Sequence, residues 1–185
     1  MIESFEKTKL AGSIAAGALD EVNNIIKPGI TTSEIDKLCY QYINDHKAYS
    51  APLYYRGYPK SCCTSSNHVV CHGIPSEKIL YDGDVINVDV TAIKDGWHGD
   101  TSRMFIVGEC SIKAKKLIKV TYDSMMKAIK TIKANTKIGN IGYTIQKIVE
   151  AEGFSVVRDF CGHGIGKKFH ESPNVLHYGE KDSGQ

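Results

Sequence analysis

An alternating run of residues ahead of an Asp-Gly pair constrains the fold of this chain more than any other feature. Between residues 84 and 93, polar positions that include Asp89 alternate with aliphatic ones, as in a strand with one buried face. The Asp95-Gly96 pair that follows is a strong signal for a two-residue hairpin turn. We therefore expect residues 84–107 to form a β-hairpin.

The length of the turn decides whether two aspartates share a face of this hairpin. If Asp95 and Gly96 alone form the loop, Asp89 lies opposite Ser102, and Asp100 is its diagonal neighbour on the same face. A diagonal separation of ~7–8 Å can be bridged by carboxylates that hold cations between them. A three-residue loop would instead place Asp100 on the opposite face.

Metal binding is one reason for aspartates to occupy such positions. Asp is disfavoured in a strand whose neighbours are Val and Ile. Two facing carboxylates also repel each other and raise a pKa unless a cation lies between them. The alternative is a pair of surface aspartates on a solvated sheet face, and the spacing leaves both interpretations open.

Hydrophobic periodicity predicts two pairs of helices, each leading into a strand region. A capping box, in which Thr31 and Glu34 bond reciprocally, begins the second helix. A constant offset aligns Ile26-Lys27 with Ile132-Lys133 and Ile35 with Ile141, which predicts two similar α+β halves with a site between them. The expected segments are helices at about 5–26, 32–47, 111–133 and 140–152, an irregular region with short strands at 51–83, and a strand near 154–160.

Three histidines lie in glycine-containing, non-helical segments. His72 follows Cys71, His163 lies between Gly162 and Gly164, and His170 comes seven residues later. An uninterrupted strand would put His163 and His170 on opposite faces, so a glycine-dependent bend is needed to bring them together. Imidazole combined with carboxylate suits Mn, Fe, Co or Zn. Ordinary structural roles are expected for His46, His68, His98 and His177.

Composition excludes several classes of protein. The net charge of +2 gives no reason to expect direct nucleic-acid binding. Six irregularly spaced cysteines without a C-x-x-C pair, following a polar N-terminal segment, indicate a reduced, cytoplasmic protein. No apolar run approaches the ~18 residues of a membrane helix. A thiol hydrolase is a weak alternative, because Cys71 directly adjoins His72 and such a pair has poor geometry for a nucleophile and its base.

Five motifs resemble the type I methionine aminopeptidases, which have the pita-bread fold. They are Tyr58-Pro-Lys-Ser-Cys-Cys, Val69-Val-Cys-His-Gly-Ile-Pro, Gly83-Asp-Val-Ile-Asn-Val-Asp-Val, Gly99-Asp-Thr-Ser and Gly162-His-Gly-Ile-Gly. The resemblance covers essentially all 185 residues. It implies an α+β fold with duplicated helix-helix-strand halves around a curved antiparallel sheet. Residues 1–185 would be a single catalytic domain whose second half is incomplete.

The same resemblance implies roles for individual residues. Asp89 would be a bidentate ligand of one divalent metal, Asp100 would bridge two, and His163 would bind the other. His72 and His170 would bracket the substrate and act in catalysis. The methionine pocket would be lined by Tyr55, Tyr58, Cys63 and Phe169, although core packing is the alternative for these four. A monovalent cation would bind main-chain oxygens of Asn67 and Val69.

The implied activity is metal-dependent removal of the initiator methionine from nascent proteins with a small second residue. The enzyme would be a monomer that meets its substrates near the ribosome. The family completes its metal site with two later glutamates, whereas the only later ones here are Glu171 and Glu180. We therefore expect a C-terminally truncated fragment. The alternative function is a catalytically inactive pita-bread binding module or a non-functional fragment.

Overall fold

The hairpin expected around Asp95 and Gly96 forms the centre of the fold. In the computed structural model, which describes residues 2–185, β3 (Val85–Lys94) and β4 (Trp97–Ile106) pair antiparallel along their whole length. Asp95 and Gly96 are the only two loop residues of this hairpin, with φ values of 50° and 79°. Left-handed conformations at both positions match the twist of the flanking strands.

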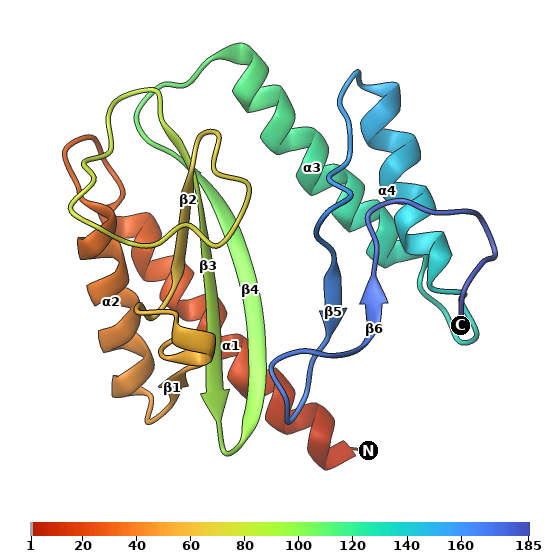
Figure 1. Ribbon diagram of the computed structural model, residues 1–185, viewed down its shortest axis with the longest axis horizontal. Coiled ribbons are helices and arrows are strands. Elements are labelled where there is room, and N and C mark those ends of the chain that lie inside the picture. Colours follow the sequence, from red (N-terminus) through yellow and green to blue (C-terminus); the bar gives the residue numbers. More distant parts are fainter. Residues whose placement is uncertain (1) are drawn as a thin grey trace. The chain divides into compact units, whose positions relative to one another are not determined.

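The chain divides into two compact units (Figure 1). The first unit comprises the residues up to Ser111 together with Ile165–Phe169. The second comprises Ile112–Gly164 and His170–Gln185. No helix in the described part of the chain is both long and apolar enough to cross a membrane.

A four-stranded sheet organises the first unit. Two strands pair with one edge of β3: the short β1 (Tyr49–Ser50) with the end of β3, and β2 (Cys63–Ser66) with its first half. The other edge of β3 pairs with β4. Because β3 has neighbours on both edges, its polar face is bordered on each side by other strands. A single-turn 3₁₀ helix, Tyr55–Gly57, lies between β1 and β2.

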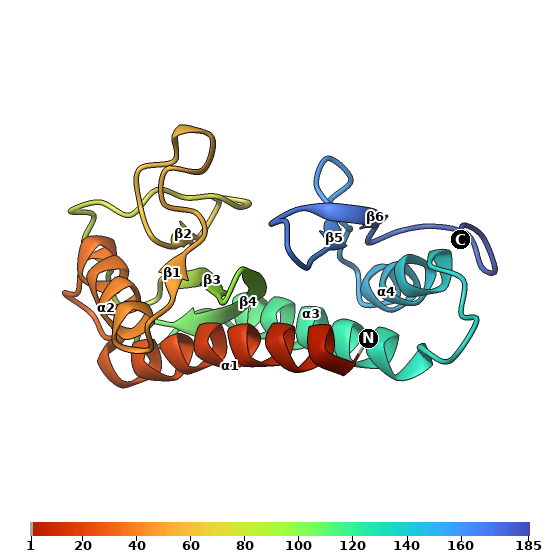
Figure 2. The same ribbon diagram turned by 90° about the horizontal axis from the view of Figure 1, so that it is seen from below.

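Two helices cover the apolar face of this sheet, α1 (Ile2–Ile25) and α2 (Thr32–Asp45) (Figure 2). The predicted capping box begins α2: Thr31 N donates to a carboxylate oxygen of Glu34 over 2.8 Å, and Glu34 N donates to Thr31 Oγ1 over 3.2 Å. Alanines on α1 allow close approach to the sheet. The core between helices and sheet contains the fully buried residues Ala15, Ala18, Val22, Ile35, Ile43, Ile86, Val88, Val90 and Ala92.

The second unit consists of two helices and a short hairpin (Figure 1). The helices are α3 (Ile112–Thr131) and α4 (Gly139–Ala151). The strands are β5 (Gly162–Gly164) and β6 (Glu171–Val175), which pair antiparallel with an irregularity after His163.

The expected duplication is visible in the ends of the helices. At the offset read from the sequence, the last residues of α1 and α2, Ile25 and Asp45, align with Thr131 and Ala151, the last residues of α3 and α4. The buried residues of α3, which are Val120, Ser124 and Ala128, align in the same way with the buried Ile14, Ala18 and Val22 of α1. Helix α3 therefore packs with the same stripe of positions as α1.

One predicted element is wrong. Residues 154–160 form no strand. Phe154 N donates to Val149 O, which closes the end of α4, and Val157 and Phe160 are exposed. Alternating apolar residues form a strand only where a neighbouring strand satisfies their backbone groups, and none of the described residues pairs with this segment.

Candidate functional site

The hairpin places the two predicted aspartates on one face. Asp89 pairs with Ser102 across the ladder, and Thr91 pairs with Asp100. This is the register expected for a two-residue loop, so the turn that the sequence left open is settled in favour of a shared face. The Asp89 residue is half-buried, whereas Asp100 is exposed.

The environment of Asp89 disfavours its negative charge. Burial raises the pKa of this carboxyl to about 7, with further contributions from the charge of Asp100 and from a hydrogen bond between the two side chains. A bound cation would relieve both the desolvation and the repulsion. The oxygen-rich pair therefore fits a divalent metal ion. Within residues 2–185, His, Cys, Asp and Glu side chains form no group of three or more that could hold a metal, so this pair is the part of the predicted centre assembled within one unit.

Strand β2 brings a thiol to the same row of residues. Cys63 pairs with Asp89 in the ladder and is 7% exposed. Burial raises the pKa of Cys63 to about 11, and the nearby charges of Asp89 and Asp100 act in the same direction. At neutral pH Cys63 is therefore a neutral, polarisable side chain.

Tyr58 is held in the same region by main-chain oxygens. Its hydroxyl lies 3.0 Å from Cys62 O and 2.9 Å from Gly73 O, and it can donate to either. Burial, followed by the hydrogen bond to Cys63, raises the pKa of Tyr58 well above its ordinary value. The hydroxyl therefore stays protonated and its ring is fixed beside Cys63.

Asp36 on α2 anchors the segment that leads into β2, a role that the sequence analysis missed. Its Oδ1 accepts hydrogen bonds from Ser61 N at 2.8 Å, Ser61 Oγ at 2.6 Å and Cys62 N at 3.2 Å. Lys60 Nζ lies 3.8 Å from Oδ2. One mostly buried carboxylate thus fixes the backbone immediately before Cys63. No short motif links positions separated by 25 residues, so no local signal could have identified this role.

Phe169 joins Tyr55 in the first unit. Their ring centroids are 5.0 Å apart with an interplanar angle of 59°, within the range of favourable aromatic pairs. His98 stacks on Phe169 with centroids 5.7 Å apart and an angle of 17°. No local motif connects His98 with these residues, because its partners are more than 60 residues away in the chain.

His72 lies where the backbone leaves the usual regions. Its φ of 55° is left-handed, which is uncommon for a residue other than glycine. The next residue holds it there: Thr64 N donates to Gly73 O over 2.8 Å, and Gly73 N donates to Ser65 Oγ over 3.1 Å. A Cβ at Gly73 would collide with Thr64 O. The exposed imidazole of His72 therefore lies on a turn that hydrogen bonds hold beside β2.

The residues predicted for a monovalent cation follow β2 directly. Asn67 has a φ of 54°, and its side chain bonds to Asp84 over 2.8 Å and to Val85 N over 3.1 Å. Val69 N donates to Ser66 O over 3.1 Å. The Asn67 side chain is therefore engaged with the start of β3, and main-chain oxygens remain the atoms suited to such a cation.

In the second unit, the predicted bend brings two histidines together. The rings of His163 and His170 have centroids 4.3 Å apart. The chain reverses between β5 and β6, and Gly164 is packed so closely against Ser172 O that a Cβ would not fit. His163 Nδ1 donates to Gly164 O over 2.9 Å, a bond that places the proton on Nδ1 and leaves the ring's lone pair on Nε2.

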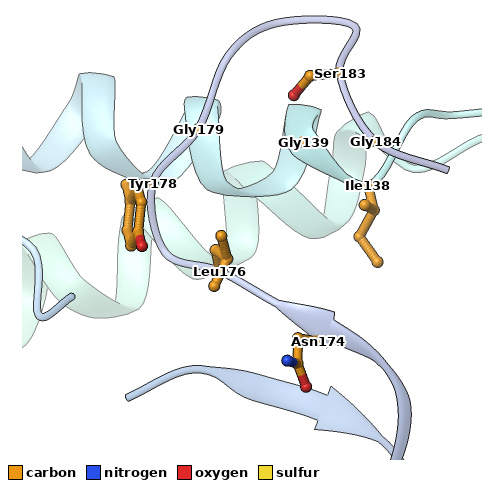
Figure 3. Close-up of a pocket in the computed structure, with 8 residues that line it drawn as sticks. All are labelled: Ile138, Gly139, Asn174, Leu176, Tyr178, Gly179, Ser183 and Gly184. Atoms are coloured by element: carbon orange, nitrogen blue, oxygen red, sulfur yellow. The ribbon is translucent and has the colours of Figure 1, made fainter. Parts of the chain in front are cut away.

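A shallow cavity of about 140 Å³ also lies in the second unit, where the segment after β6 loops over the start of α4 (Figure 3). Leu176, Tyr178 and Ile138 form its apolar part. None of the predicted site residues lines it. Ser183 O accepts from Gly139 N over 3.0 Å, so this segment caps α4, and the cavity is a consequence of that packing.

The predicted residues are distributed over both units. The first unit contains Asp89, Asp100, His72, Tyr55, Tyr58, Cys63, Phe169, Asn67 and Val69. The second contains His163 and His170.

Several known proteins are similar to this chain over almost its whole length. The model of metallopeptidase family M24 matches residues 6–185. Methionine aminopeptidase of Rickettsia prowazekii (strain Madrid E) is 52% identical over 182 residues, which are 98% of this chain and 70% of that protein. Methionine aminopeptidase of Escherichia coli (strain K12) is 52% identical over 183 residues, 98% of this chain and 69% of that protein. The crystal structure of the R. prowazekii protein matches with a TM-score of 0.98 and 51% identity, covering 100% of this chain and 75% of that chain.

Proposed function

Because this chain belongs to metallopeptidase family M24, we propose that it is an aminopeptidase that removes the N-terminal methionine from nascent polypeptides. Its similarity to the methionine aminopeptidases supports this activity and confirms the α+β, pita-bread fold. The structural observation that carries the proposal is the pair Asp89 and Asp100 on one face of the hairpin. The raised pKa of Asp89 shows that this carboxyl holds a proton tightly, and a bound cation would take the place of that proton.

The family uses divalent metal ions. In our proposal Asp89, Asp100 and His163 hold two of them, with Mn, Fe, Co and Zn as candidates. When bound, such ions activate a water molecule and polarise the scissile carbonyl. Asp89 and Asp100 contribute charge neutralisation from a rigid strand pair, and His163 contributes a ring whose tautomer is set by Gly164 O.

The substrate would be oriented by two histidines and an apolar pocket. His72 and His170 would donate hydrogen bonds to the scissile amide and to the oxygen that becomes negative in the tetrahedral intermediate. Tyr55, Tyr58, Cys63 and Phe169 would surround the methionine side chain. The packing of Tyr55 against Phe169 and of Tyr58 against Cys63 within one unit supports this role.

The alternative functions have less support. The similarity to proteins named methionine aminopeptidase does not favour a non-catalytic binding module. A thiol hydrolase needs a thiolate, whereas burial raises the pKa of Cys63 to about 11 and also raises the pKa of Cys71.

Other aspects of the proposal concern the setting of the reaction. We place the enzyme in the cytoplasm as a monomer that meets its substrates near the ribosome. Its six free cysteines accord with a reducing compartment. A monovalent cation would bind main-chain oxygens of Asn67 and Val69.

The test is hydrolysis of the tripeptide Met-Ala-Ser by protein that has been stripped of metal and then titrated with each candidate divalent ion. Activity should appear with metal and should not extend to Met-Phe-Ser. Asp100→Asn should lower kcat on the order of 100-fold or more, because it weakens a group that acts through the metals. Calorimetric titration of the metals provides a readout independent of turnover.

Asp95→Asn is the matched control, since Asp95 lies in the turn of the same hairpin. It should retain both metal binding and activity. Normal Met-Ala-Ser cleavage by Asp100→Asn, or activity that persists in excess chelator, would contradict the proposal.

A further inference from the structure

One buried histidine binds the segment Ile165–Phe169 to strand β4. His98 N donates to Gly166 O over 2.8 Å, and His98 Nδ1 lies 3.1 Å from the same oxygen. Both His98 and Gly166 are buried. The main chain and the side chain of His98 therefore hold a single carbonyl group in place.

The same ring contacts an aromatic side chain. His98 stacks almost parallel on Phe169, with 5.7 Å between centroids and 17° between planes. Phe169 in turn lies 5.0 Å from Tyr55. A ring that is fixed at its edge by a carbonyl offers a rigid surface to its neighbour, so the placement of Phe169 depends on both contacts of His98.

His98 differs in burial from His46, a second histidine with the same kinds of contact. His46, at the end of α2, lies 2.8 Å from Tyr42 O and stacks on the Tyr42 ring with centroids 4.2 Å apart. His46 is exposed, and both of its contacts are within one helix turn. His98 instead joins two parts of the chain that are 68 residues apart.

We propose that His98 is a positioning residue for methionine specificity, acting through Phe169. This inference rests on the proposed function, since it concerns the pocket wall of that same site. The carbonyl contact fixes where the segment lies along β4, and the stack fixes the plane of the Phe169 ring. His98 itself does not touch the substrate.

Two variants separate these contributions. His98→Phe keeps an aromatic surface and removes the ring hydrogen bond, whereas His98→Asn keeps a donor and removes the stack. The contribution of an aromatic pair predicts that His98→Asn raises the KM for Met-Ala-Ser by about 2- to 10-fold. The change in kcat should be smaller than the change in KM. His98→Ala, which removes both contacts, should raise the KM more than either of the other variants. His46→Asn is the matched control and should leave KM unchanged.

Fluorescence gives a readout that does not depend on activity. Trp97 is the only tryptophan of the chain, and Lys167 Nζ of the bound segment lies 5.5 Å from its ring centroid. Release of the segment should change the Trp97 emission and speed hydrogen exchange at His98 N. Both changes should occur in His98→Ala and be absent in His46→Asn.

The outcomes distinguish this inference from the proposed function. If the wild-type protein does not cleave Met-Ala-Ser, the proposed function fails, while fluorescence and exchange still decide whether His98 holds the segment. Unchanged emission and exchange in His98→Ala would overturn the inference. It would also be overturned if kcat fell in His98→Asn while KM stayed constant. If His98→Ala does not fold, the Phe and Asn variants carry the same comparison.

Discussion

Replacing Asp89 by asparagine should stabilise the metal-free protein at pH 8, even though it removes a proposed metal ligand. Burial and the neighbouring Asp100 raise the pKa of Asp89 from an ordinary 3.8 to about 7. The unfolded chain releases this proton near pH 4, whereas the folded protein keeps it until about pH 7. Because the folded state binds more protons across this interval, the free energy of unfolding falls as the pH rises from about 4 to about 7.

The magnitude follows from the width of that interval. The raised and ordinary pKa values of Asp89 differ by about 3 pH units, and each unit corresponds to about 1.4 kcal/mol. Ionisation of Asp89 in the folded, metal-free protein therefore lowers the free energy of unfolding by roughly 4 kcal/mol at pH 8. Asparagine resembles the protonated acid in shape and carries no charge. Asp89→Asn should thus match the wild type only below about pH 4, exceed it by roughly 1.6 kcal/mol at pH 5, and exceed it by up to about 4 kcal/mol at pH 8.

The assay is urea unfolding in excess chelator at pH 5 and pH 8, followed by circular dichroism. Asp95→Asn is the control, because asparagine also adopts the left-handed conformation found at Asp95. It should behave like the wild type at both pH values. A saturating divalent metal at about 100 times its Kd should add ~2.7 kcal/mol to the wild type and much less to Asp89→Asn. An equal difference between Asp89→Asn and wild type at both pH values would refute the reasoning.

Three further predictions concern the scaffold around the site. Gly99→Ala should destabilise the protein by about 1–3 kcal/mol in thermal melts, because its Cβ would collide with the α1 backbone at Gly12. The Cβ of Gly12→Ala meets open space, so this control variant should instead stabilise the protein. The opposite order of stabilities would contradict this packing. Cys63, with its pKa raised to about 11, should react slowly with iodoacetamide at pH 8 and about tenfold faster per pH unit up to pH 10; a pH-independent rate in mass spectrometry would be inconsistent with its burial. Asp36→Ala should lower the free energy of unfolding in urea by roughly 3 kcal/mol, since it leaves the main-chain N–H groups of Ser61 and Cys62 without their carboxylate acceptor. A loss below about 0.5 kcal/mol would show that solvent replaces the carboxylate.

Much of the site could be predicted because its geometry is local. Alternation along residues 84–93 and the two-residue turn at Asp95 and Gly96 together determine which side chains share a face of the hairpin. The bend between His163 and His170 is also local, since it depends on the glycines that lie beside them. These features needed only backbone rules that hold over a few residues.

The strand expected at residues 154–160 failed for the complementary reason. Its alternation is local, but a strand exists only when another segment supplies hydrogen bonds. None of the described residues does so here. A pattern of period two therefore indicates what a segment can form, and pairing decides whether it does.

The sequence by itself determined the hairpin, the duplicated helices and the family to which the chain is similar, because these follow from periodicity, turn chemistry and contiguous motifs. It left open whether the two aspartates share a face, and the two-residue loop of the structure decided that they do. Only the tertiary structure decided the pKa of Asp89, which depends on its burial on the central strand β3 between β2 and β4. It also decided the roles of Asp36 and His98, which act on backbone 25 and 68 residues away. Burial and long-range contacts arise only when distant segments pack together, so no local pattern records them.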